Sequence, residues 1–367
     1  MTEPTERLIP GHVRGLARYQ PGKLIEDVLD EMGLTSAVKL ASNENSLGPS
    51  PKALEAARAA LSGLARYGDA DSRRLREKIS AKLGFPAARI VAGNGSSEII
   101  LTLCHTVLDR GLRAVMSRPS FTLYAKNTQA AGAEAVEVPL TKEFGHDLAA
   151  VRKNLGANAR LVFLDNPLNP SGSYLQPREI EGLAADLPEA CALVLDEAYA
   201  DFARDPRPDY QKLMATGKVI VLRTFSKVMG LAGLRAAYAL APAPLAEALN
   251  KTRQPFNLNT LAQLGAMAAL DDDEHVARTL AMTWESLDEY YDVLPRLGLT
   301  VRPTQANFLM AGLPAGLSAD EVTKRMLRDG VIIRSLSSFG LPGHVRVNAG
   351  QKFEREALYK SLEKALA

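Results

Sequence analysis

Cysteine is scarce in this sequence, with only Cys104 and Cys191 among 367 residues. Two cysteines so far apart form neither a disulfide framework nor a paired metal or redox motif. Their scarcity fits a reducing compartment, and we therefore predict a cytoplasmic protein without a metal site. Because both residues lie within apolar runs, we expect their thiols to be buried and inert.

A strong excess of one charge and a long apolar run are also absent. The 44 basic and 42 acidic residues give a formal net charge of +2, which predicts no binding to nucleic acid or to an anionic membrane surface. No apolar run reaches the roughly 18 residues of a membrane span, and residues 1–20 lack the apolar core of a signal peptide. The remaining composition, 46% hydrophobic and 23% charged, is typical of a soluble globular protein.

A lysine that follows a buried strand is the strongest local signal. Residues 219–222 read Val-Ile-Val-Leu, which is typical of a strand covered on both faces. Lys227 follows at the strand end, where α/β proteins bind ligands. Apolar surroundings disfavour an ammonium ion and make the amine a nucleophile toward carbonyl groups. Arg235, beyond a Gly-x-x-Gly turn, can return to this place as an anion ligand. Such a pair is what pyridoxal phosphate requires.

Upstream, the pattern of strand, glycine turn and helix indicates an anion site. We predict a strand at Arg89–Ala92, a turn at 93–97 and a helix from Glu98 to Leu108. Free backbone N–H groups and the positive end of the helix dipole converge at such a turn. Gly93 and Gly95 also match the start of a dinucleotide fingerprint, but Glu98 replaces its third glycine, so a nicotinamide site is the weaker alternative.

Polar residues end two further buried strands. Residues 161–164 run into a turn with two Asn-Pro pairs, which can fix the amide of Asn169 in one orientation. Residues 192–195 run into Asp196, a carboxylate that needs a partner when buried, such as a protonated pyridine nitrogen. Tyr199 follows three residues later and can reach a ring hydroxyl. A helix N-cap remains an alternative role for Asp196.

Strands and helices alternate over residues 90–240, which predicts an α/β fold: a mostly parallel sheet with helices on both faces. We expect residues 1–45 to form an arm that contributes to a small domain, 46–270 a large domain, and 271–367 a small α+β domain. Its expected strands are 306–310, 331–334 and 344–348, and its helices 319–329 and 354–367. In the last strand, alternation places Arg346 opposite Val345 and Val347. The acidic run Asp271–Asp273 is predicted as a solvated turn between helices.

Five ordered motifs resemble the fold-type I pyridoxal-phosphate enzymes, and within them the histidinol-phosphate aminotransferase family. They are Leu40-Ala41-Ser42-Asn43-Glu44-Asn45, Asn166-Pro167-Leu168-Asn169-Pro170-Ser171-Gly172, Asp196-Glu197-Ala198-Tyr199, Arg223-Thr224-Phe225-Ser226-Lys227 with Gly230-Leu231-Ala232-Gly233-Leu234-Arg235, and Val345-Arg346-Val347. The resemblance extends from about Tyr19 to the C-terminus.

This resemblance implies a role for each matching residue. Lys227 would form the Schiff base and move the proton, and Asp196 would pair with the pyridine nitrogen. The remaining cofactor-binding residues would be Asn169 and Tyr199 at the ring hydroxyl, Phe121 stacked on the ring, and Ser96, Ser97, Ser226 and Arg235 at the phosphate. Tyr67 would reach the phosphate of a neighbouring subunit, which implies a homodimer. The substrate-binding residues would be Tyr19, Asn43, Arg334 and Arg346.

The implied reaction is ping-pong transamination between L-histidinol phosphate and 2-oxoglutarate. The sequence departs from the family pattern at Ser46, at Ser335–Phe339 and at Asn348–Gly350. None of these positions belongs to the cofactor set, but the segment between Arg334 and Arg346 borders the part that recognises the substrate side chain. An aromatic amino-acid aminotransferase and a threonine-phosphate decarboxylase therefore remain alternatives.

Overall fold

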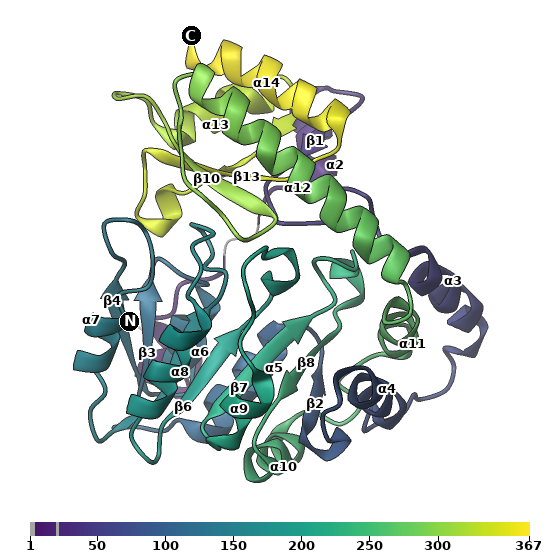
Figure 1. Ribbon diagram of the computed structural model, residues 1–367, viewed down its shortest axis with the longest axis vertical. Coiled ribbons are helices and arrows are strands. Elements are labelled where there is room, and N and C mark those ends of the chain that lie inside the picture. The colour runs from purple at the N-terminus through teal and green to yellow at the C-terminus, as the bar shows by residue number, and fades with distance from the viewer. Residues whose placement is uncertain (1–3, 20–21) are drawn as a thin grey trace.

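A seven-stranded sheet forms the centre of the larger part of the molecule (Figure 1). The computed structural model describes residues 4–19 and 22–367. The strand order is β2 (Ile90–Gly93), β8 (Ala237–Leu240), β7 (Val219–Thr224), β6 (Ala192–Asp196), β5 (Ala159–Asp165), β3 (Arg113–Arg118) and β4 (Glu134–Pro139). All neighbours are parallel except β8, which runs antiparallel to both β2 and β7. The predicted α/β fold with a mostly parallel sheet is confirmed, although the sequence did not reveal β8.

Helices cover both faces of this sheet. One face packs against α5 (Ser96–Val107), α6 (Leu123–Ala130) and α10 (Ala243–Thr252). The other packs against α3 (Pro51–Ala60), α4 (Arg73–Leu83), α7 (Leu148–Lys153), α8 (Pro177–Asp186), α9 (Tyr210–Ala215) and α11 (Thr260–Ala269). Along β7, Val219 and Val221 join one core while Ile220 and Leu222 join the other. This alternation explains why the strand is apolar at every position.

The C-terminal part forms a smaller body around an antiparallel sheet in the order β12-β13-β10-β9. Its strands are β9 (Thr300–Val301), β10 (Phe308–Gly312), β12 (Arg334–Ser335) and β13 (His344–Asn348). Its helices are α12 (Asp273–Arg296), α13 (Ala319–Leu327) and α14 (Lys352–Leu366). Val345 and Val347 face the core of this body, and Arg346 lies on the other face as predicted.

The predicted strand at 331–334 was wrong as one element. Val331 and Ile332 form β11, which pairs in parallel with β1 (Val38–Lys39), whereas Arg334 begins β12 in the antiparallel sheet. The chain thus passes from one sheet to the other within three residues. The pairing of β1 with β11 brings the N-terminal segment onto the small body. The exact boundaries at 45 and 270 stay a prediction.

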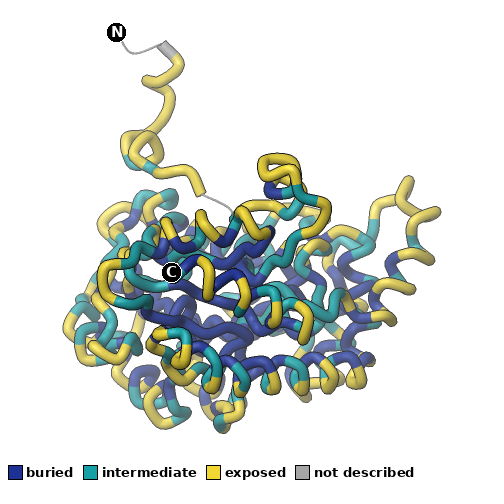
Figure 2. Tube along the Cα trace, turned by 90° about the horizontal axis from the view of Figure 1, so that it is seen from above, coloured by how far each residue is buried: buried dark blue, intermediate teal, exposed yellow. Residues whose placement is uncertain are grey.

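The N-terminal segment also contains α1 (Gly11–Arg14) and α2 (Ile25–Met32). Figure 2 shows residues 4–19 projecting from the body of the molecule as a mostly exposed segment. Leu8 is 82% exposed there, so an apolar side chain on this arm lies open to solvent in the single subunit.

The structure also tests the predictions about the two cysteines and about the acidic run Asp271–Asp273. Cys104 and Cys191 are free thiols, and the expectation that they are buried is confirmed. Burial raises their pKa to about 12 and about 11, which favours the unreactive thiol form. The acidic run does separate two helices, α11 and α12, but it is not fully solvated. Asp272 is only 5% exposed, and its carboxylate accepts a hydrogen bond from Ser50, the N-cap residue of α3.

Candidate active site

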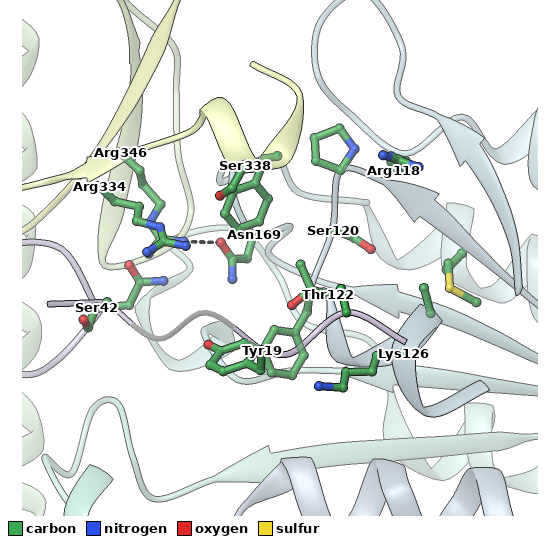
Figure 3. Close-up of a pocket in the computed structure, with 18 of the residues that line it drawn as sticks. Tyr19, Ser42, Arg118, Ser120, Thr122, Lys126, Asn169, Arg334, Ser338 and Arg346 are labelled. Atoms are coloured by element: carbon green, nitrogen blue, oxygen red, sulfur yellow. Dashed lines mark hydrogen bonds between the residues drawn. The ribbon is translucent and has the colours of Figure 1, made fainter. Parts of the chain in front are cut away.

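Two adjoining cavities lie where the C-terminal ends of the parallel strands meet the small body. The smaller has a volume of about 230 Å³ and the larger about 640 Å³. The two cavities share five lining residues and are therefore neighbouring parts of one site. The shared residues are Tyr19, Phe121, Asn169, Tyr199 and Lys227. Figure 3 shows the larger cavity. The crevice at the strand ends is where open α/β sheets bind ligands.

Lys227 stands at the junction of the two cavities. Its Nζ contacts the carbonyl oxygen of Ser42 at 3.5 Å and lies 5.5 Å from the centre of the Tyr199 ring. Burial, together with the nearby Arg346 guanidinium, lowers the pKa of Lys227 to about 8. A much larger fraction of this amine is therefore neutral near pH 7 than for an ordinary lysine.

Asp196 lies at the inner end of the smaller cavity and is 4% exposed. One carboxylate oxygen accepts a hydrogen bond from the Tyr124 hydroxyl at 2.9 Å, and the other accepts from the Ala198 N–H at 3.0 Å. Burial raises the pKa of Asp196 to about 6, although the Tyr124 hydrogen bond acts in the opposite direction. A cationic ligand group beside this carboxylate would favour its ionised form.

The opposite end of the smaller cavity carries donors for an anion. Ser96 and Ser97 begin α5, and their backbone N–H groups lie at the helix start, where such groups can bind an anion. Ser226 and Arg235 complete this end from the loop after β7. Gly95 precedes the helix with a φ of +79°, and a Cβ there would lie 2.3 Å from an Arg235 guanidinium nitrogen. Glycine at this position therefore makes room for the arginine.

Between the two ends lie the residues expected at the ring of the cofactor. Phe121 lines both cavities, and the Tyr199 hydroxyl accepts a hydrogen bond from the Asn43 amide nitrogen at 2.8 Å. Burial raises the pKa of Tyr199 to about 12, so its phenol keeps a proton that it can donate. Asn43 adopts the left-handed backbone conformation with a φ of 55°, which an asparagine tolerates better than most residues.

Arg346 reaches across from the small body to the large one. One guanidinium nitrogen donates to the Asn169 side-chain oxygen, and another donates to the Ala41 carbonyl at 2.8 Å. Its Nε has no hydrogen-bond partner among the described residues, although it is buried. Arg334 and Tyr19 line the same larger cavity, so all four expected substrate-binding residues, Tyr19, Asn43, Arg334 and Arg346, border one space (Figure 3).

Tyr67 is the one expected site residue that the structure places elsewhere. Its side chain is 88% exposed and its ring lies 4.8 Å from that of Phe256, outside both cavities of its own subunit. All other expected cofactor residues, from Ser96 to Arg235, line the smaller cavity.

Two buried groups were missed by sequence reasoning. Tyr124 lies one helical turn after Phe121, and its hydroxyl contacts Asp196. Asp165 ends β5 in register with Asp196 on β6, lines the smaller cavity and is 2% exposed. One of its oxygens accepts a hydrogen bond from the Asn169 N–H at 2.8 Å. The other has no hydrogen-bond partner among the described residues, although the His146 Nε2 lies 3.9 Å from it. A carboxylate at the end of a buried strand was the signal used for Asp196, and it applied equally to Asp165.

The comparison with known proteins agrees with this geometry. The family model described as aminotransferase class I and II matches residues 35–362. The chain belongs to this family. A histidinol-phosphate aminotransferase of Akkermansia muciniphila is 41% identical over 358 residues, covering 97% of this chain and 98% of that protein. Another, from Anaeromyxobacter sp. (strain Fw109-5), is 40% identical and covers 98% of this chain and 99% of that protein. The resemblance inferred from the motifs is confirmed.

Solved aminotransferase structures share the fold. The histidinol-phosphate aminotransferase from Sinorhizobium meliloti, in complex with pyridoxal-5'-phosphate, matches with a TM-score of 0.89 and 28% identity, covering 98% of this chain and 97% of that one. An L-threonine-O-3-phosphate decarboxylase from Porphyromonas gingivalis matches with a TM-score of 0.80 at 24% identity, covering 90% and 99%. At that identity the likeness extends to the fold alone.

Two features are absent from the described residues. Across residues 4–19 and 22–367, none of the helices combines the length and apolar character needed to cross a membrane. The same ranges contain no group of three or more histidine, cysteine, aspartate or glutamate side chains arranged to hold a metal ion.

Proposed function

We propose that this aminotransferase uses pyridoxal 5'-phosphate to transfer the amino group of L-histidinol phosphate to 2-oxoglutarate. The observation that carries the proposal is the position of Lys227, which lines the same small cavity as a buried carboxylate, Asp196, and an anion-binding helix start at Ser96. The two relatives of about 40% identity named histidinol-phosphate aminotransferase support the substrate.

The smaller cavity fits this cofactor by its chemistry. A phosphate suits the end with Arg235 and the N–H groups of α5, and a pyridinium nitrogen suits the end with Asp196. The Asn169 amide nitrogen and the Tyr199 hydroxyl can donate to a ring oxygen between them. Gly95 leaves the space that Arg235 occupies, which a Cβ would take. Lys227 supplies the amine of this cavity and would hold the aldehyde group of the cofactor.

When bound, the cofactor supplies an electron sink for the bonds at the amino-bearing carbon of the substrate. Asp196, which is 4% exposed, would keep the ring nitrogen protonated through an ion pair. Lys227 Nζ holds the proton that this carbon releases, and its pKa of about 8 allows the amine to accept a proton near neutral pH. Tyr199 orients the ring through its hydroxyl, which Asn43 fixes at 2.8 Å.

Arg346 and Arg334 are suited to the phosphate ester of histidinol phosphate. The Nε of Arg346 is buried without a partner among the described residues, and a buried donor gains free energy when an anion accepts its hydrogen. Arg334 lies with its guanidinium carbon 5.9 Å from the centre of the Phe339 ring, at the border of the larger cavity. Since Phe339 belongs to the segment that departs from the family pattern, an aromatic amino acid is the second candidate donor.

A half-reaction without 2-oxoglutarate tests the substrate. The loaded enzyme is mixed separately with L-histidinol phosphate and L-phenylalanine, and the loss of the cofactor absorption band is followed. We expect histidinol phosphate to react much faster. Faster reaction with phenylalanine would assign the enzyme to aromatic amino acids, and release of carbon dioxide from threonine phosphate would instead indicate the decarboxylase.

The proposal includes a homodimer in the cytoplasm. Tyr67, Phe256, Leu61 and Leu64 are exposed aromatic or leucine side chains, between 45% and 88% exposed, and a second copy would cover such a surface. In that dimer Tyr67 reaches the phosphate end of the neighbouring site. Sedimentation of the purified protein measures the assembly, and a stable monomer with full cofactor content would contradict it. The buried free thiols support a reducing compartment.

A further inference from the structure

Lys126 lines the larger cavity with a charge that none of the roles above uses. It lies on α6, where Thr122, Ala125, Lys126 and Gln129 follow one another at the spacing of a single helix face, and all four line the cavity. Lys126 is the one charged member of this face. The residue is partly buried, and its side-chain amine forms neither a hydrogen bond nor an ion pair with any residue in the ranges 4–19 and 22–367.

The position of α6 is fixed relative to the cofactor site. The buried side of the helix carries Tyr124, whose hydroxyl donates to Asp196 at 2.9 Å, and Phe121 precedes the helix between the two cavities. Figure 3 shows Arg334 and Arg346 at one end of the cavity, Thr122 and Lys126 toward the other, and Tyr19 between them. The amine of Lys126 points toward the same space as Tyr19.

The other cations on this side of the cavity are less suited to a ligand. Arg118 forms an ion pair with Glu137 at 3.1 Å, and its side chain is 69% exposed, so its charge is both paired and screened. Arg18 lies on the exposed N-terminal arm. Of these three cations Lys126 is the one whose side chain is both partly buried and without an ion pair among the described residues.

The two substrates of a ping-pong reaction must place different groups in one cavity. In histidinol phosphate the amino-bearing carbon carries an anionic arm and an imidazole arm. In glutamate, the amino acid made from 2-oxoglutarate, the same carbon carries a carboxylate and a second arm that ends in another carboxylate. If the shared anion lies at Arg334 and Arg346, then the space opposite must accept an imidazole in one half-reaction and a carboxylate in the other.

We infer that Lys126 binds the distal carboxylate of the dicarboxylic substrate and so selects 2-oxoglutarate as the amino acceptor. This inference rests on the proposed function. The imidazole of the donor offers an ammonium group one neutral acceptor nitrogen at most. The distal carboxylate of the acceptor carries a full negative charge and forms a stronger, charge-assisted hydrogen bond. Lys126 is thus a specificity residue for one of the two half-reactions.

The test measures the two half-reactions separately in the loaded enzyme. In Lys126→Met we expect the second-order rate constant for 2-oxoglutarate to fall about tenfold or more, because this is the usual effect of losing a charged hydrogen bond. The second-order rate constant for glutamate in the reverse direction should fall by the same factor. The same constant for histidinol phosphate should change less than about twofold, and pyruvate, which lacks the distal carboxylate, should be unaffected by the substitution. Lys126→Arg should retain most of the preference for 2-oxoglutarate.

Arg118→Met is the matched control, because it removes a more exposed, ion-paired cation from the same wall, and we expect each half-reaction to change less than about twofold. Calorimetry gives a readout independent of turnover: glutarate should bind more weakly to Lys126→Met, and inorganic phosphate should bind as before. Equal losses for histidinol phosphate and 2-oxoglutarate, or unchanged glutarate binding, would refute the role of Lys126. If the wild-type enzyme reacts with glutamate but not with histidinol phosphate, then histidinol phosphate is not the amino donor. The rates with glutamate in the wild type and in Lys126→Met would still decide the role of Lys126.

Discussion

Replacing Gly95 by alanine should weaken cofactor binding by displacing Arg235. The new Cβ would lie 2.3 Å from one guanidinium nitrogen and 2.9 Å from the guanidinium carbon, distances at which the arginine must move. Each hydrogen bond between a guanidinium and a phosphate is worth about 1.5–3 kcal/mol. Loss of one such bond therefore raises the dissociation constant of pyridoxal phosphate by about 10- to 150-fold.

Backbone strain must be separated from this effect, because Gly95 has a φ of +79° that alanine adopts only at a cost. Gly111 has a φ of +83°, and nothing lies within 4 Å of the position that a Cβ would take there, so Gly111→Ala carries strain without a clash. Titration of the apoenzyme with pyridoxal phosphate gives the dissociation constants, and thermal melting of the apoenzyme gives the stability cost.

The decisive comparison uses Arg235→Ala as a second background. If Gly95→Ala acts through the arginine, it should weaken cofactor binding strongly in the wild type and only slightly when Arg235 is already absent. Fully additive losses in free energy would show that the glycine acts by backbone strain alone, and unchanged binding in the single variant would show that Arg235 does not hold the phosphate.

Three further predictions concern other residues. In the apoenzyme, the rate at which the Lys227 amine reacts with an acylating reagent should rise with pH with a midpoint near its pKa of about 8, because burial disfavours the charged form. A midpoint above about pH 10 would contradict its role as a base near neutral pH. Asp165→Asn should raise the melting temperature of the apoenzyme more at pH 8 than at pH 4. Burial raises the pKa of Asp165 well above its usual range, so the unfolded chain releases this proton above about pH 4 while the folded chain keeps it. The stability of the folded wild type therefore falls as pH rises. An equal difference in melting temperature at both pH values would contradict this. Tyr67→Phe should loosen cofactor binding modestly in the dimer, and unchanged retention during dialysis would argue against contact with the neighbouring phosphate.

The sequence predicted the large sheet well because its strands carry an unambiguous pattern. Residues 161–164, 192–195 and 219–222 are apolar at every position, since both faces of the sheet are covered, and each lies within an observed strand. The strand β8 was missed because Ala237–Leu240 has two alanines and no polar residue at its end to mark a site. The split at Ile333 was missed because a change of sheet leaves the hydrophobic pattern intact.

Within the site, the residues with a motif were found and those without one were missed. Lys227 and Asp196 follow clear strands, and both line the smaller cavity together. Tyr124 and Lys126 lie on α6. Helix periodicity shows which of its residues share a face, but it does not show which face meets the cavity. Their positions depend on how α6 packs against the sheet, which involves contacts distant in sequence. Asp165 was recognisable by the same reasoning as Asp196, but its unpartnered oxygen becomes visible only in three dimensions.

The hydrogen bonds of Arg346 bear on how this family can diverge. Arg346 ties β13 to the Asn169 turn and to the Ala41 carbonyl, so it holds three distant segments of the chain together. Losing it would leave buried polar groups unpaired as well as removing an anion ligand. We therefore expect evolution to retain the anion end of the cavity and to alter substrate range at the opposite wall, where a change of Lys126 or its neighbours on the cavity-lining face of α6 would break no hydrogen bond between distant segments of the described chain.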